Sequence, residues 1–338
     1  MVEKVLAIPG DGIGVEVMTA ALEVVGPAGI DWDLIIRDDI NTDLWMRTGE
    51  TLDPQLLEDL GRGRYAAILF GAIGSPDAPE GVVERATLLR LRFCFQLSLN
   101  VRPLRLPERL SSPLASGQRI DAVCVRENTE GAYVGVDGAL HRDTDDEVAT
   151  TVSLSTRRGA ERAMRHGFEL ARGRRRQVTL VHKANVLSAE GSLWKRVGDA
   201  VSRDFPDVSL VYSHADAAAM KLVTHPEQFD VIVTDNLFGD LLTDIGAALA
   251  GGIGLAASSN INPKTNLALF EPVHGSAPDI VGQGLADPTA MIRCVAMCAR
   301  HLGNGAAADR IDKAIDAAID PERKPSTTGQ LEAVLGNL

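Results

Sequence analysis

The pattern of apolar and polar residues predicts short, buried strands that alternate with helices. Most of the apolar runs are continuous rather than alternating, which is typical of strands buried on both faces. Helical patterns lie between many of them, for example over 156–172 and 193–204. The pattern therefore predicts an α/β fold with a mixed, largely parallel sheet. The predicted strand segments are KVLAIPG (4–10), YAAILFGAIG (65–74), DAVCVRENTEG (121–131), QVTLVHKAN (177–185), VSLVYSHAD (208–216) and FDVIVTDNLFGD (229–240).

Composition narrows the class of protein. The chain has 338 residues, enough for two core-bearing domains, and no internal repeat or linker rich in Pro, Gly or Ser separates them. The net charge of −12 argues against non-specific binding to nucleic acid or to an anionic membrane. The four cysteines form no CxxC pair, and the longest uncharged run, 245–263, is a poor membrane span. Because the first residues resemble a strand and a turn rather than a leader, we expect a cytoplasmic protein.

Charged side chains follow four of the predicted strands. Arg126, Lys183 and Asp216 each come at or just after the end of an apolar run, and the last run leads into the segment that holds Asp240. In open α/β sheets, ligands bind at the carboxyl ends of the strands. A single polar strand end would mean little, but the series predicts a binding site at this edge.

Two aspartates in NLFGDLLTDIG (236–246) indicate a metal site. Asp240 and Asp244 are four residues apart on one face of a predicted helix, where two carboxylates repel each other unless a cation lies between them. Their neighbours are mainly apolar, which is unusual for a solvated pair. Oxygen ligands favour a hard ion such as Mg²⁺ or Mn²⁺, and Asp216 is a plausible third ligand.

Arginine, tyrosine and lysine side chains are candidates for binding an acidic substrate and moving its protons. Arg92, Arg102 and Arg126 could each bind a carboxylate through the guanidinium fork, with Arg102 expected just before a proline that ends regular structure. Tyr133 and Lys183 could transfer protons if nearby cations lower their pKa values. Each residue taken alone has a structural interpretation as a surface ion pair or a packed side chain.

A third region, FEPVHGSAPDIVGQGLADPTA (270–290), is expected to be a long loop in which small residues let the backbone approach a ligand. It carries His274, Asp279 and Asp287, and an acidic residue there could accept hydrogen bonds from ribose hydroxyls while repelling a 2′-phosphate. The turn PGDGIG (9–14) is neither a Rossmann nor a Walker motif. Composition and spacing alone do not establish a dinucleotide site.

Taken together, these segments resemble the β-decarboxylating dehydrogenases, which act on 3-isopropylmalate, isocitrate, homoisocitrate and tartrate or D-malate. The resemblance covers nearly the whole chain. It implies the isocitrate/isopropylmalate dehydrogenase fold rather than a Rossmann fold. It also implies a larger, cofactor-side domain (1–98 plus 251–338) and a smaller domain with the dimer interface and the catalytic and metal residues (99–250). The matching segments are IPGDGIGVEV, LLRLR, NVRP, VRENTEGAY, HKANV, DAAAM, TDNLFGDLLTD and FEPVHGSAPDI.

The resemblance also implies roles for individual residues. Lys183 would take the proton of the substrate hydroxyl while hydride passes to NAD⁺, a divalent metal would stabilise the enolate left after loss of CO₂, and Tyr133 would return a proton to carbon. Lys183 and the metal ligand Asp216 would reach across a homodimer. Asp279 stands where NAD-using members keep an aspartate. The implied metal ligands are Asp216, Asp240 and Asp244; the implied substrate ligands are Leu88, Leu89, Arg92, Arg102, Arg126 and Asp216; and the implied NAD ligands are His274, Gly275, Ser276, Ala277, Pro278, Asp279 and Asp287.

The substrate's variable group is expected to meet the helix that contains RATLLRLR (85–92). There Leu88 and Leu89 favour the alkyl group of 3-isopropylmalate, because a carboxylate would be left unpaired between them. Arg85 and the segment RENTEG leave other substituents open, namely homoisocitrate, tartrate or D-malate, and phosphonate- or aryl-substituted malates. A non-catalytic regulatory subunit is disfavoured because Tyr133, Lys183 and the aspartates are all present.

Overall fold

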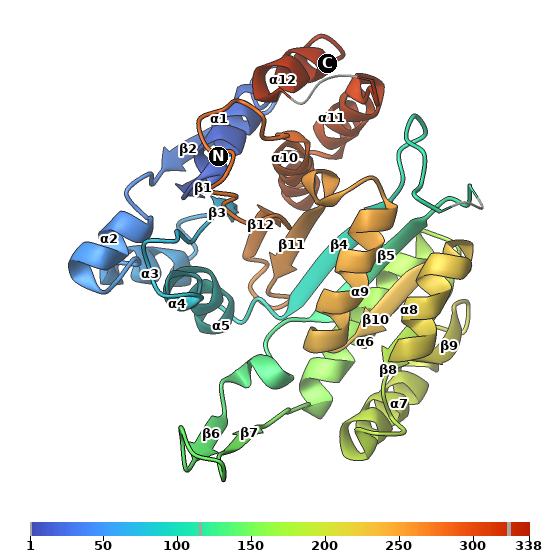
Figure 1. The fold of residues 1–338 in the computed structure, drawn as a ribbon. Helices are drawn as coiled ribbons and strands as arrows, with labels where there is room; N and C mark the ends of the chain where they lie inside the picture. The colour runs from blue at the N-terminus through green and yellow to red at the C-terminus, as the bar shows by residue number, and fades with distance from the viewer. Residues whose placement is uncertain (1, 115–116, 323–325) are drawn as a thin grey trace. The chain divides into compact units, whose positions relative to one another are not determined.

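The computed structural model describes residues 2–114, 117–322 and 326–338, and the chain divides into two compact units (Figure 1). Unit 1 comprises Met1–Leu97, Leu106–Gly117 and Ala247–Leu338, whereas unit 2 comprises Ser98–Arg105 and Gln118–Gly246. Both ends of the chain therefore belong to the same unit. The roles that the resemblance assigns to the two domains stay a prediction.

Unit 1 is built on a sheet in which the strands follow the order β2-β1-β3-β12-β11. The pairs β2–β1, β1–β3 and β3–β12 are parallel, and β12–β11 is antiparallel. The strands are β1 (Glu3–Gly10), β2 (Trp32–Ile36), β3 (Ala67–Ala72), β11 (Ala257–Ile261) and β12 (Ala268–Pro272). The helices are α1 (Ile13–Glu23), α2 (Thr42–Thr48), α3 (Pro54–Gly61), α4 (Val82–Glu84), α5 (Arg90–Cys94), α10 (Thr289–His301), α11 (Gly305–Ala318) and α12 (Thr327–Leu335), with a 3-10 turn at Ile253–Leu255.

The sheet of unit 1 is covered on both faces, as the continuous apolar runs predicted. In β1, Val5 and Ala7 pack into a cluster with apolar residues of α1, α10, α11 and α12. The alternate residues Leu6 and Ile8 pack into a second cluster with α3 and α5. Because successive side chains of a strand point to opposite faces, a strand buried on both sides needs apolar residues at every position.

Unit 2 contains a sheet in the order β4-β5-β10-β8-β9, in which β5, β10, β8 and β9 are parallel and β4 runs antiparallel to β5. A separate antiparallel hairpin, β6–β7, projects from this unit (Figure 1). The strands are β4 (Leu99–Arg105), β5 (Asp121–Glu127), β6 (Asp137–Leu140), β7 (Val148–Thr151), β8 (Gln177–His182), β9 (Ser209–His214) and β10 (Val231–Thr234). The helices are α6 (Arg157–Arg172), α7 (Ser188–Ser202), α8 (Ala215–Thr224) and α9 (Asn236–Leu249), with 3-10 turns at Ala132–Val134 and Pro226–Gln228.

Helix α6 packs closely on the sheet of unit 2 because its inner face carries small residues. A Cβ atom on Gly167 would lie only 2.3 Å from Cγ2 of Val233 in β10. Met164 and Phe168 flank this glycine and are fully buried. The glycine therefore lets helix and strand approach at a distance that a larger side chain would prevent.

The predicted α/β class and the six predicted strand segments are confirmed, and the prediction for the segment around Arg102 is wrong. Pro103 does not end regular structure: β4 continues through it, paired with β5 from Leu99 to Arg105. A proline ring fits extended backbone, and it also biases the preceding residue toward the extended region. The apolar pattern also failed to predict strands β2, β11 and β12. Strand β12 includes Phe270–Pro272, which the sequence analysis had assigned to a loop.

Among the described residues, no helix is long and apolar enough to cross a membrane.

Candidate active site

The parallel strands of unit 2 bring the predicted site residues to one edge of their sheet. Thr234, the last residue of β10, pairs with Arg126 of β5 on one side and with Val181 of β8 on the other. Lys183 follows β8 directly, and α9 begins two residues after β10. The expectation that these charged residues lie at carboxyl ends of neighbouring strands is therefore confirmed.

Two arginines and a tyrosine converge on the carboxylate of Asp240. Arg126, only 2% exposed, donates from Nη1 to Oδ1 of Asp240. Nη2 of Arg102 lies 3.4 Å from the same oxygen. Tyr133 donates its hydroxyl to Oδ2 across 2.8 Å. Asp244, one turn further along α9, is within 3.7 Å of Nη1 of Arg102.

Neutral side chains that the sequence reasoning missed hold the two guanidinium groups. Asn236 accepts from Nε of Arg126, at 2.8 Å. Asn100 accepts from Nε of Arg102 and Thr243 from its Nη1, both also at 2.8 Å. All three lie within segments that the sequence had singled out, Asn236 and Thr243 in NLFGDLLTDIG and Asn100 in NVRP, so proximity in sequence to the charged residues was an available signal.

Gly239 is a further residue that the sequence reasoning missed. A Cβ atom on this glycine would lie 2.7 Å from Cγ of Arg126, so the stem of the arginine passes directly over the first turn of α9. The residue before Asp240 must be small for Arg126 to reach that carboxylate.

The electrostatics of the aspartate pair suit a divalent cation. Burial opposes ionisation of Asp240, but the charges of Arg126 and Arg102 outweigh it and hold the pKa of this carboxyl below its usual value. Burial and the neighbouring charge of Asp240 raise the pKa of Asp244. An ion between them would relieve that repulsion, and a donor set of carboxylate oxygens fits Mg²⁺ or Mn²⁺.

The condition that nearby cations lower the pKa of Tyr133 is not met in this structure. Burial raises the pKa of its hydroxyl, and the hydrogen bond to the Asp240 carboxylate raises it further, since ionising the phenol would remove the donor and place two negative charges together. The guanidinium of Arg126, 5.3 Å from the centre of the Tyr133 ring, lowers this pKa, but by less than burial and Asp240 raise it. Tyr133 is therefore held in its protonated form, which is the form of a proton donor.

Lys183 and Asp216 form a second pair at this edge. Nζ of Lys183 lies 2.7 Å from Oδ2 of Asp216, which is in the first turn of α8 and has a side chain 67% exposed. The ammonium hydrogen bond lowers the pKa of the Asp216 carboxyl. The pair combines a positioned ammonium group with a solvent-facing carboxylate.

Arg92, a predicted carboxylate ligand, lies in unit 1 and is already paired. Its Nη2 is 2.5 Å from Oε1 of Glu271, and both side chains are buried. Asn260 donates to the same oxygen from Nδ2, at 2.8 Å. Glu271 lies in the FEPVHGSAPD segment, but nothing in the sequence indicated its contact with a residue 179 positions away.

The segment RATLLRLR, expected as a regular helix, contains a π-helical turn at Arg85–Leu89. The wider turn accommodates Thr87, whose buried hydroxyl donates to the carbonyl of Val83 and lies 2.7 Å from the hydroxyl of Thr51. Arg85 is exposed, while Leu88 and Leu89 are half-buried. A single apolar stripe at regular helical spacing is thus not what presents these leucines.

The loop that follows β12 folds against the first turn of the chain. The backbone N–H of Ile13 donates to the carbonyl of Ser276 at 2.9 Å. A Cβ on Gly12 would lie 2.2 Å from that carbonyl, which explains why a glycine precedes α1 here. Ala277 has a positive φ of 40°, a conformation that L residues adopt rarely. Gly275 and Asp279 are exposed, as is Pro278.

His274 and Asp287 in this loop differ in how far their polar groups are already used. The Nδ1 atom of His274 lies 3.0 Å from the carbonyl of Gly275, whereas Nε2 is buried and makes no hydrogen bond with the described residues. Burial lowers the pKa of His274. Asp287 accepts the backbone N–H of Thr289, the first residue of α10, at 2.9 Å.

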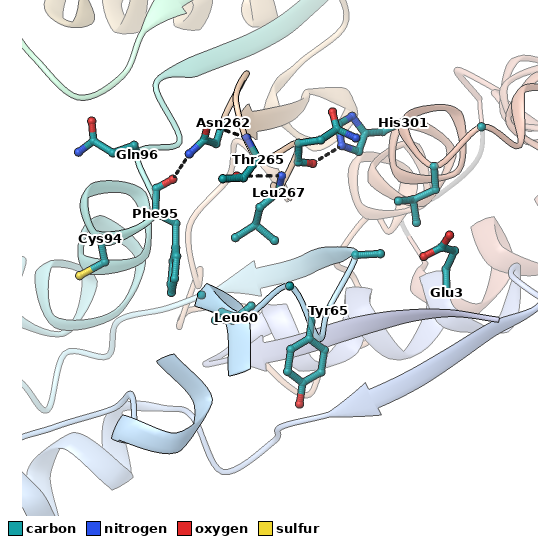
Figure 2. A pocket seen from close by; sticks show the side chains of 16 residues that line it. Glu3, Leu60, Tyr65, Cys94, Phe95, Gln96, Asn262, Thr265, Leu267 and His301 are labelled. Carbon is teal, nitrogen blue, oxygen red and sulfur yellow. Dashed lines mark hydrogen bonds between the residues drawn. The ribbon is translucent and has the colours of Figure 1, made fainter. Parts of the chain in front are cut away.

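A cavity of about 680 Å³ lies elsewhere in unit 1, near the amino ends of β1, β3 and β12 (Figure 2). Its walls include Glu3, Tyr65, Phe95, Asn262 and His301, and Asn262 donates to the carbonyl of Phe95 there. The lining contains none of the predicted site residues. Because ligands of open α/β sheets bind at carboxyl strand ends, this cavity is not the candidate active site.

Comparison with known proteins adds an independent result. The sequence matches the family described as isocitrate/isopropylmalate dehydrogenase over residues 4–334. The 3-isopropylmalate dehydrogenase of Mycolicibacterium paratuberculosis is 51% identical over 330 residues, covering 96% of this chain and 97% of that protein. That of Corynebacterium efficiens is 52% identical over 331 residues, covering 96% of each. The crystal structure of isocitrate dehydrogenase from Methylococcus capsulatus matches with a TM-score of 0.88 and 35% identity, covering 99% of both chains.

Proposed function

Because this chain belongs to the isocitrate/isopropylmalate dehydrogenase family, we propose that it catalyses the NAD- and divalent-metal-dependent oxidative decarboxylation of 3-isopropylmalate. The products would be 4-methyl-2-oxopentanoate and CO₂, in a reaction of leucine biosynthesis. The names of relatives that share about half of its residues support this substrate. The structural observation that carries the proposal is the convergence of Arg102, Arg126 and Tyr133 on the carboxylate of Asp240.

The two arginines of unit 2 are suited to bind a carboxylate of the substrate. Arg102 and Arg126 are both buried, and each has its Nε fixed by an asparagine side chain. Their Nη atoms point toward Asp240, so an anion near a metal-bound Asp240 would meet preorganised donors. Arg92 is proposed as a third ligand for a substrate carboxylate. Because Arg92 is paired with Glu271, it would bind the substrate either alongside this ion pair or in place of it.

Asp240 and Asp244 are proposed as metal ligands, with Asp216 supplied by a second copy of the chain. The raised pKa of Asp244 beside Asp240 indicates repulsion that a cation would remove. Bound there, Mg²⁺ or Mn²⁺ would act as a Lewis acid toward the oxygen of the reacting carbon.

Lys183 and Tyr133 are proposed to move the protons. Lys183, only partly exposed and held 2.7 Å from Asp216, would accept the proton of the substrate hydroxyl once it has released its own proton and become a neutral amine. Tyr133 is kept protonated by burial and by Asp240, so it can deliver a proton to carbon after CO₂ has left. Tyr133 is thus in the protonation state that its proposed role needs.

The loop after β12 is proposed as the NAD site. Its candidate ligands are His274, Gly275, Ser276, Ala277, Pro278, Asp279 and Asp287. Nε2 of His274, buried without a partner among the described residues, supports a polar ligand at this loop. The exposed carboxylate of Asp279 favours NAD over NADP, because it would repel a 2′-phosphate. The oxidant supplied there would accept hydride from the hydroxyl-bearing carbon.

The substituent specificity is assigned to Leu88 and Leu89, both half-buried. Burying the isopropyl group against such side chains contributes roughly 0.8 kcal/mol per CH₂. The exposed Arg85, close by in the same helix, supports the second candidate, a relative that acts on another 3-substituted malate such as homoisocitrate.

A homodimer is part of the proposal. Exposed apolar side chains recur at helical spacing on two helices of unit 2, Met220 and Val223 on α8 and Leu237 and Leu241 on α9. Exposed apolar side chains that gather in one patch would mark a protein–protein interface. The exposed apolar side chains of the β6–β7 hairpin, such as Leu140, add to it.

A product balance tests the proposed reaction. The purified protein, incubated with 3-isopropylmalate, NAD⁺ and Mg²⁺, should form NADH, CO₂ and 4-methyl-2-oxopentanoate in equal amounts, and a chelator should stop all three. NADH without CO₂, or activity that persists without a divalent metal, would contradict it.

A further inference from the structure

A buried imidazole and two carboxylates lie together in unit 2, and the imidazole belongs to His182, the residue before Lys183. His182 ends β8, Asp235 follows β10, and Glu190 is in the first turn of α7. Because β8 and β10 are parallel neighbours paired through Val181 and Thr234, the next residue of each strand lies at the same edge. Nε2 of His182 is 3.4 Å from Oδ2 of Asp235 and 4.0 Å from Oε2 of Glu190.

The imidazole of His182 has polar atoms that the rest of the described structure does not satisfy. The side chain is 0% exposed, and neither ring nitrogen has a hydrogen-bond partner among the described residues. The rings of Trp194 and Phe238 enclose it, with centroids 6.1 and 5.6 Å away. A fully buried imidazole without a partner is rare, because the lost hydration is not replaced.

The carboxylates are anchored so that one oxygen of each faces the imidazole. Oδ1 of Asp235 accepts the backbone N–H of Phe238 at 2.9 Å, which leaves Oδ2 toward His182. Oε2 of Glu190 accepts from the hydroxyl of Ser153 at 3.2 Å. The nitrogen–oxygen separations of 3.4 and 4.0 Å exceed the usual hydrogen-bond range of about 2.7–3.2 Å.

Direct pairing of charged groups is also disfavoured here. Burial lowers the pKa of His182 to about 4 and raises the pKa of Asp235 to about 7. An imidazolium ion facing a carboxylate is therefore not the stable form at neutral pH. A neutral imidazole beside two carboxylates instead offers a set of three ligand atoms that lie within 4.8 Å of one another.

We propose that His182, Glu190 and Asp235 form a second metal site, selective for a borderline transition cation such as Zn²⁺ or Co²⁺. Zinc binds imidazole nitrogen and carboxylate oxygen at about 2.0–2.2 Å, so two ligand atoms in tetrahedral geometry lie about 3.3–3.5 Å apart. The separation between Nε2 and Oδ2 has this value, and the partly exposed Glu190 can close the remaining gap. One neutral and two anionic ligands would neutralise a divalent ion completely.

The nitrogen ligand distinguishes this site from the aspartate site. Asp240 and Asp244 offer only oxygen, which suits Mg²⁺ or Mn²⁺, whereas imidazole favours zinc and its neighbours in the transition series. An ion at His182 would join the ends of β8 and β10 to α7 and so fix the backbone that carries Lys183. The inference does not depend on the proposed substrate or reaction.

The site can be tested by counting bound ions. The full-length protein, stripped with a chelator and dialysed with Zn²⁺ in a large excess of Mg²⁺, should retain one Zn²⁺ per chain. Glu190→Gln removes a ligand and should weaken Zn²⁺ binding by at least about tenfold. Asp199→Asn, an exposed position on the same helix, is the matched control and should bind like the unaltered protein. Equal zinc binding by the unaltered protein and Glu190→Gln would overturn the proposal.

A second measurement does not depend on how the variants fold. Crystals of the unaltered protein soaked in Zn²⁺ should show an anomalous peak at the zinc edge between His182, Glu190 and Asp235. Density without anomalous signal would identify a water molecule, and either that result or an empty site would overturn the proposal.

Discussion

The hydroxyl of Tyr133 donates a hydrogen bond to Oδ2 of Asp240 across 2.8 Å, although the two residues are 107 positions apart in the chain. The same carboxylate receives Arg126 at its other oxygen. Asp240 therefore keeps the tyrosine protonated while the arginine keeps the aspartate ionised. This arrangement links the candidate proton donor to the candidate metal ligand.

Replacing Tyr133 tests this link. Tyr133→Phe retains the ring under Arg126 and removes only the hydroxyl, so we expect kcat to fall by about 10²- to 10⁴-fold, the usual contribution of a positioned acid. Steady-state kinetics with 3-isopropylmalate measure the effect. Tyr65→Phe in unit 1 is the matched control and should leave kcat unchanged. A Tyr133→Phe enzyme with normal kcat would exclude the tyrosine as the proton donor.

Replacing Lys183 tests the sharing of active sites. Lys183→Met should lower kcat by about 10²-fold or more while changing the free energy of unfolding by less than about 1 kcal/mol, since its partner Asp216 is exposed. Lys195→Met, at an exposed lysine of α7, is the control.

Mixed dimers test whether the active sites are shared. If each site of a dimer takes Tyr133 from one chain and Lys183 from the other, then unfolding and refolding the Lys183→Met and Tyr133→Phe proteins together should restore about a quarter of the activity of the unaltered enzyme. No restored activity in verified mixed dimers would contradict shared sites.

A methyl group at position 239 should displace Arg126, the proposed carboxylate ligand. In Gly239→Ala the added Cβ would lie 2.7 Å from Cγ of Arg126, so Arg126 or α9 must shift. We expect a loss of about 1–3 kcal/mol in the free energy of unfolding, as for other overpacked sites, together with a raised KM. Gly305→Ala is the control, because its Cβ would meet nothing within 4 Å. Unchanged stability and KM in Gly239→Ala would show that Arg126 does not need this contact.

Asp244 should destabilise the metal-free protein. Its pKa is raised in the folded state, so folding favours the protonated form, and stability falls as the pH rises past the ordinary carboxyl value of about 3.9. Asp244→Asn should therefore raise the unfolding temperature at neutral pH without metal. It should also lose most of the Mg²⁺ effect, which for the unaltered protein is about 2.7 kcal/mol at a hundredfold excess over Kd. Thermal unfolding of the unaltered protein and of Asp244→Asn, each with and without Mg²⁺, measures both effects. Equal stabilisation of the two proteins by Mg²⁺ would show that Asp244 is not a metal ligand.

Breaking the buried pair in unit 1 should be costly. Glu271→Gln leaves Arg92 buried without its counter-charge, and we expect a loss of about 3–5 kcal/mol in the free energy of unfolding. Urea titration measures the loss, with the exposed Glu23→Gln at the end of α1 as the control. A loss below about 1 kcal/mol would mean that another group compensates the charge of Arg92.

The α/β class and six of the strands could be predicted from the sequence because the apolar runs that indicate them are local. Continuous apolar runs fix a buried strand by themselves, and the spacing of Asp240 and Asp244 fixes their common face on α9. The strand containing Pro103 was missed since a proline usually interrupts a ladder, yet β4 accepts it. The π-helical turn at Arg85–Leu89 was missed because the spacing of RATLLRLR does not distinguish it from an α-helical turn, and the contact of its Thr87 with Thr51 joins distant segments.

The candidate site was predictable in its charges but not in their pairing. Charged residues at strand ends identified Arg126, Lys183 and Asp240. The direction in which the pKa of Tyr133 shifts could not be predicted, because the sequence shows the nearby cations and not which partner accepts the phenolic hydrogen bond. The pairing of Arg92 with Glu271 likewise arises from tertiary packing, which no local pattern encodes.

The proposed substrate is tested most directly by comparing kcat/KM for 3-isopropylmalate and homoisocitrate under identical NAD⁺ and Mg²⁺ concentrations. The half-buried Leu88 and Leu89 predict a preference for 3-isopropylmalate of at least about 10²-fold, since a carboxylate between them would be left unpaired. Equal values, or a preference for homoisocitrate, would contradict the assignment and identify the enzyme as a relative that acts on another substituted malate.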